Sequence, residues 1–99
     1  MVEVAQKNVE DDWAWFEDYV FATADWTVNC PADRQCQVGM GLMAFGEPRG
    51  EEIRFSGVQE FTTLGAGAIH IRVTDGRGAC PVRLDRGKVG LISIVDKPF

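Results

Sequence analysis

The sequence lacks a hydrophobic run long enough to cross a membrane. Its longest apolar stretch is only a few residues, whereas a membrane-spanning helix needs about 20. The opening segment, MVEVAQKNVEDD, also lacks the basic start and apolar centre of a secretory signal peptide. We therefore expect a soluble cytoplasmic protein without membrane contact, in which cysteines stay reduced.

Catalytic motifs are also scarce. The sequence has one histidine, His70, and alternation places it on a strand face with the polar residues Arg72 and Thr74, which is typical of a solvated face. No nucleophile motif stands beside it. The glycine-rich stretch GMGLMAFG does not have the dinucleotide-binding spacing, and no phosphate-binding G-K-[ST] motif occurs. We expect no enzyme activity, no cofactor and no bound metal.

What the chain does have is the size and composition of one globular domain. It is 99 residues long, with 45% hydrophobic and 25% charged residues. This composition is typical of folded rather than disordered chains, and the length corresponds to a single domain, residues 1–99.

The negative charge is concentrated at the start of the chain. Residues 1–25 carry a net charge of −6, and residues 26–99 carry a net charge of +1. Such an acidic segment repels nucleic-acid phosphates and attracts basic surfaces. We therefore expect no direct contact with nucleic acid, and a larger basic protein or protein complex as the partner.

The segment NVEDDWAWFEDYVFAT, residues 8–23, has the pattern of an amphipathic helix. Asn8 provides a cap, and three acidic residues follow in the first turn, where the helix dipole favours negative charge. Four apolar residues recur at the spacing of one helical face: Val9, Trp13, Phe16 and Val20.

After residue 25 the apolar residues alternate with a period of two, which predicts about six short strands joined by short turns. Strands joined by short turns pair in antiparallel fashion. The expected fold class is α+β, with one N-terminal amphipathic helix packed on a curved antiparallel sheet of five to six strands. We expect these residues in the core: Trp13, Phe16, Trp26, Val28, Val38, Leu42, Phe55, Ile69, Ile71, Val82, Leu91 and Ile94.

One flank of the predicted helix is a candidate docking surface. Trp15 and Tyr19 lie there, surrounded by Asp11, Asp12 and Asp18. Aromatic side chains anchor interfaces and charges steer association, although the same aromatic pair also fits the edge of a wide core stripe. We expect a small acidic binding protein of the immunity, anti-defence or adaptor type, which docks on a larger basic partner. Inhibition of that partner is one outcome of such docking. The alternative is a structural subunit of a homo-oligomer, joined through strand edges.

The three cysteines leave alternatives open. Cys30 and Cys36 flank a five-residue turn, and all three cysteines are in phase with apolar neighbours, which favours buried thiols. A Cys30–Cys36 disulfide across a hairpin is the second reading. The third is a metal site that combines the three cysteines with His70, although their spacing is not that of zinc modules.

The stretch ADWTVNC followed by Cys36 resembles the opening of domains of the invasion-associated locus B family. These are secreted bacterial proteins that show a W-x-V-x-C stretch and a nearby second cysteine. The resemblance covers residues 25–36 and implies a further alternative, a small exported domain.

Overall fold

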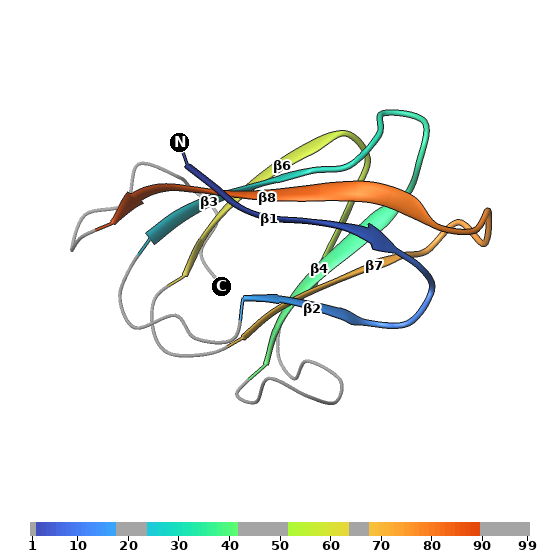
Figure 1. The fold of residues 1–99 in the computed structure, drawn as a ribbon, viewed down its shortest axis with the longest axis horizontal. Helices are drawn as coiled ribbons and strands as arrows, with labels where there is room; N and C mark the ends of the chain where they lie inside the picture. Colours follow the sequence, from blue (N-terminus) through green and yellow to red (C-terminus); the bar gives the residue numbers. More distant parts are fainter. Residues whose placement is uncertain (1, 18–23, 42–51, 64–67, 90–99) are drawn as a thin grey trace.

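The computed structural model describes residues 2–17, 24–41, 52–63 and 68–89, and all regular structure in these ranges is strand. Two four-stranded antiparallel sheets share one apolar core (Figure 1). Sheet A has the order β1-β8-β3-β6 and sheet B the order β2-β7-β4-β5. The strands are β1 (Val2–Val9), β2 (Ala14–Glu17), β3 (Ala24–Asn29), β4 (Cys36–Gly41), β5 (Glu52–Phe55), β6 (Val58–Thr63), β7 (Ala68–Val73) and β8 (Cys80–Val89).

The expected N-terminal helix is wrong, and with it the α+β fold class. Residues 8–17 end one strand, turn at residues 10–13 and form β2, while residues 18–23 lie outside the described ranges. In β2 the period is two, since Ala14 and Phe16 pack on the core and Trp15 is exposed. The segment is rich in aromatic residues and valine, which favour strands, and tertiary pairing with β7 decides the outcome.

The two sheets cover each other with alternating apolar residues. In β7, Ile69, Ile71 and Val73 belong to the shared core, whereas Arg72, between them, is only partly buried. Most described members of the expected core are buried, which confirms their assignment: Phe16, Trp26, Val28, Val38, Phe55, Ile69, Ile71 and Val82. Trp13 is only partly buried, so its assignment is wrong, and Leu42, Leu91 and Ile94 lie outside the described residues.

The short turns do not join neighbours within one sheet. Four connections each carry the chain across the core from one sheet to the other: residues 10–13, 30–35, 56–57 and 74–79. The strand registers place all four at the same end of the molecule, on the right in Figure 1. We call this the arch end. The expected single sheet of hairpins is therefore replaced by two facing sheets.

Two local features of the strands are set by the tertiary structure. Residues 52–63 form two strands in different sheets, β5 and β6, divided by a turn in which Gly57 has a φ of 72°. Glycine adopts this left-handed conformation without steric cost. The stretch DRGK, residues 85–88, has the composition of a turn but lies within β8. Within the described ranges, the protein contains no helix long and apolar enough to span a membrane.

Replacement of Phe61 tests whether the two sheets share one core. Its side chain in β6 is fully buried. We expect Phe61→Ala to lower the free energy of unfolding by about 3–5 kcal/mol, because the lost ring leaves a cavity between the two sheets. Urea denaturation followed by tryptophan fluorescence measures the change.

Val58→Ala, in the same strand, is the matched control. Val58 is 61% exposed, so we expect its replacement to change stability by no more than about 0.5 kcal/mol. Equal losses in the two variants would show that β6 does not present Phe61 to the core.

Candidate functional site

Three of the five predicted docking residues gather beside the arch end. Asp11 and Asp12 are exposed in the turn between β1 and β2. Trp15, in β2, is 42% exposed, and its side chain lies on the outer face of sheet B. Asp18 and Tyr19 lie outside the described residues. A turn and a strand therefore carry this surface, rather than the flank of a helix.

Trp15 is held by its strand neighbours. It pairs with His70 of β7 in the antiparallel register, and Lys7 of β1 donates a hydrogen bond from Nζ to the Trp15 carbonyl. The Lys7 ammonium also lies 5.3 Å from the centre of the Phe16 ring. His70 is only 1% exposed, so the expectation of a solvated histidine is wrong.

A polar row crosses the outer face of sheet B beside the docking residues. Gln37 of β4 stands between Arg72 of β7 and Arg54 of β5 in the strand register. Arg72 donates from Nε to Gln37 Oε1 at 2.8 Å, and Gln37 donates from Nε2 to Glu52 Oε2 at 2.6 Å. The Arg72 guanidinium lies 4.6 Å from the centre of the Trp13 ring, within cation–π range.

Two members of this row, Arg54 and Arg72, line a pocket of about 300 Å3. The lining residues come from sheet B and the arch end: Asp11, Arg54, Arg72, Val73, Thr74 and Gly76. Arg54 and Arg72 are not among the site residues predicted from the sequence. The available signal was their alternation with apolar residues in strands 52–55 and 68–73, which places both on the solvent face of a strand.

An ion pair joins two of the sheet-crossing turns. Arg34 binds both carboxylate oxygens of Asp75, from Nε at 2.8 Å and from Nη2 at 3.1 Å. Arg34 also donates to the carbonyls of Gly78 and Ala79. The hydrogen bond from Arg34, followed by that from the Gln35 backbone N–H, holds the pKa of Asp75 well below its usual value.

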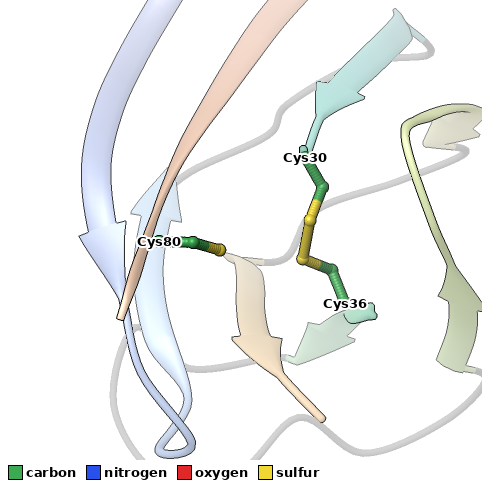
Figure 2. A group of neighbouring side chains, drawn as sticks. All are labelled: Cys30, Cys36 and Cys80. Carbon is green, nitrogen blue, oxygen red and sulfur yellow. A yellow bond between two sulfur atoms is a disulfide. The ribbon is translucent and has the colours of Figure 1, made fainter. Parts of the chain in front are cut away.

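The cysteines lie in the core beside this ion pair. Cys30 and Cys36 form a disulfide, the second of the three readings of the sequence, with their Cα atoms 6.7 Å apart. It links the end of β3 in sheet A to the start of β4 in sheet B, and therefore does not cross a hairpin. Cys80 remains a buried free thiol, and burial raises its pKa. Its side chain points toward the disulfide (Figure 2), and all three sulfur atoms lie within 4.8 Å of one another.

No protein-family model, curated protein or solved structure matches the chain. The likeness of residues 25–36 to the invasion-associated locus B family therefore remains a resemblance over a short stretch.

The low pKa of Asp75 predicts acid sensitivity. Because this pKa is lower in the folded than in the unfolded chain, the stabilisation is complete above the ordinary value of 3.8 and is lost as the pH falls below it. We expect Asp75→Asn to be less stable than the wild type at neutral pH. The difference should shrink as the pH is lowered from about 4, as measured by urea denaturation at several pH values.

Asp33→Asn is the control for this experiment. Asp33 pairs with Arg77 at 3.5 Å, but both side chains are largely exposed, and exposed pairs contribute little to stability. A difference between wild type and Asp75→Asn that stays constant down to the lowest pH would contradict the assignment.

The disulfide predicts the number of reactive thiols. Denatured protein should react with one equivalent of a thiol reagent without reductant and with three after reduction, since Cys80 alone is free. Reduction should lower the free energy of unfolding by about 2 kcal/mol, because the cross-link closes a short loop in the unfolded chain. The double variant Cys30→Ala/Cys36→Ala should not respond to reductant. Three reactive thiols before reduction would rule out the disulfide.

Proposed function

We propose that this chain is a non-catalytic binding protein that docks on a larger basic protein or complex through the surface of Asp11, Asp12 and Trp15. The observation that carries the proposal is the 42% exposure of the Trp15 side chain on a paired strand. A large aromatic ring held on a rigid strand anchors an interface at a low cost in conformational entropy.

Charge near Trp15 supports a basic partner. Asp11 and Asp12 are exposed in the adjoining turn, where carboxylates attract basic side chains over a distance of about 10 Å at moderate salt. The arch end also concentrates loops at one end of a sandwich, a common location for binding residues. Inhibition of the partner follows if the docked surface covers its working site.

The test distinguishes the contribution of the Trp15 ring to binding from that of the Asp11 and Asp12 carboxylates. Trp15→Ala should speed dissociation and weaken binding by about 2 kcal/mol if the ring is an interface anchor. Asp11→Lys with Asp12→Lys should slow association and reduce its dependence on salt. The partner is first captured from the native host by a photo-crosslinker at position 15, and rates are then measured by biolayer interferometry.

Position 58 provides the matched control. Val58 is exposed on sheet A, so a crosslinker there should not capture the same protein, and Val58→Ala should bind normally. The proposal fails if Trp15→Ala lowers the melting temperature while binding rates stay unchanged, because the ring then serves the fold alone.

A second candidate function is that of a small exported domain, and the disulfide favours it. Disulfides persist in oxidising compartments and are rare in the cytoplasm, whereas the sequence alone predicts a cytoplasmic protein. Blocking free thiols in intact cells of the native host, followed by fractionation, tests the two locations. An oxidised Cys30–Cys36 pair in the exported fraction supports export. A fully reduced chain in the cytoplasmic fraction supports a cytoplasmic location.

A further inference from the structure

Three sulfur ligands converge inside the core at the arch end. Cys30 follows β3, Cys36 begins β4 and Cys80 begins β8, so three strands from both sheets supply them. All three residues are buried, and their sulfur atoms lie within 4.8 Å of one another (Figure 2). This cluster plays no part in the proposed docking surface.

We propose that the cluster, once its disulfide is reduced, is a binding site for one soft metal ion, with Cu(I) as the ion of best fit. Thiolates are soft ligands that select Cu(I) and zinc. Structural zinc takes four protein ligands, whereas in the described ranges no imidazole or carboxylate joins the three sulfurs. Cu(I) accepts three thiolates in a plane, which matches the number available.

The reaction requires a reductant. A phosphine gives two electrons to the Cys30–Cys36 bond and becomes a phosphine oxide, while water supplies the oxygen of the oxide and the two protons of the new thiols. With a dithiol as the reductant, the dithiol supplies both protons and becomes a disulfide. Cu(I) then binds the sulfurs and displaces their protons to the solvent, while its own oxidation state does not change. The oxidised protein offers a single thiol, so the disulfide controls the site.

The backbone around the sulfurs is held by contacts that do not depend on the disulfide. The Cys30 N–H donates to the Gly57 carbonyl at 2.8 Å, and the Thr74 N–H donates to the Gln35 carbonyl at 2.9 Å. The Arg34–Asp75 ion pair joins the turn between Cys30 and Cys36 to the turn that leads to Cys80. These links keep the three residues close together after reduction.

The experiment uses the full chain under anaerobic conditions after phosphine reduction. Cu(I) is supplied as the complex of a coloured chelator, and the protein should remove one Cu(I) per chain, with three sulfur neighbours counted by X-ray absorption. Cys80→Ser should bind at least about tenfold more weakly, since loss of even an outer-shell partner costs 10–100-fold in affinity. The oxidised wild type should leave the chelator complex intact.

Any one of these results would overturn the proposal: equal affinity of Cys80→Ser and wild type, two sulfur neighbours instead of three, or uptake of Cu(I) by the oxidised protein. If the serine hydroxyl disturbs the core, Cys80→Ala replaces Cys80→Ser as the test variant. Near-ultraviolet circular dichroism of the oxidised variants shows whether they are folded. If reduction unfolds the wild type, Cu(I) should restore the native spectrum. Binding that leaves the chain unfolded would count against the site.

Discussion

The chain crosses between the two sheets at every described step except the one from β4 to β5, and this constraint shapes the molecule. Apart from β4 and β5, strands that follow one another in the sequence lie in different sheets and cannot form hydrogen bonds with each other. β1 therefore depends on β8 for its pairing, and β3 depends on β6 and β8. Non-local pairing of this kind costs loop-closure entropy before it returns any contact energy. The arch end brings four of the chain reversals to one end of the molecule.

The turn between β3 and β4 is the most heavily restrained of these reversals. The disulfide closes its base, and Arg34 in its middle reaches the turn between β7 and β8. The buried guanidinium is compensated by both oxygens of Asp75 and by two carbonyls. Loss of either partner would leave a buried charge without compensation. The covalent link therefore joins the two sheets across the turn between β3 and β4, and the ion pair joins this turn to the turn between β7 and β8.

Alternation in the sequence predicts the strands and most of their inward faces, as residues 69–73 show, because the period of two reports burial directly. It does not separate a strand from a helix over residues 8–17, because Val9 and Phe16 share one helical face in the sequence and are also buried in two separate strands, β1 and β2. Turn residues predict that the chain reverses direction. A hairpin within one sheet and a connection between two sheets have the same local sequence signals, so the sequence does not show the division into two sheets. The exposure of Trp15 follows from alternation in β2. The Arg34–Asp75 pair, 41 residues apart, depends on tertiary structure alone.

The folded surface also changes the meaning of the charge asymmetry in the sequence. The acidic segment does not form an isolated acidic face, because the register brings Arg72 beside Trp13, and Asp11 shares a pocket with Arg54 and Arg72. Under the proposed function, a partner that docks at Trp15 meets carboxylates in the turn and guanidinium groups on the same sheet, sheet B. Under the proposed function, net charge then governs only the approach of the partner. Specificity comes from the order of the two signs across the face, since a misplaced basic group would be repelled by the arginines.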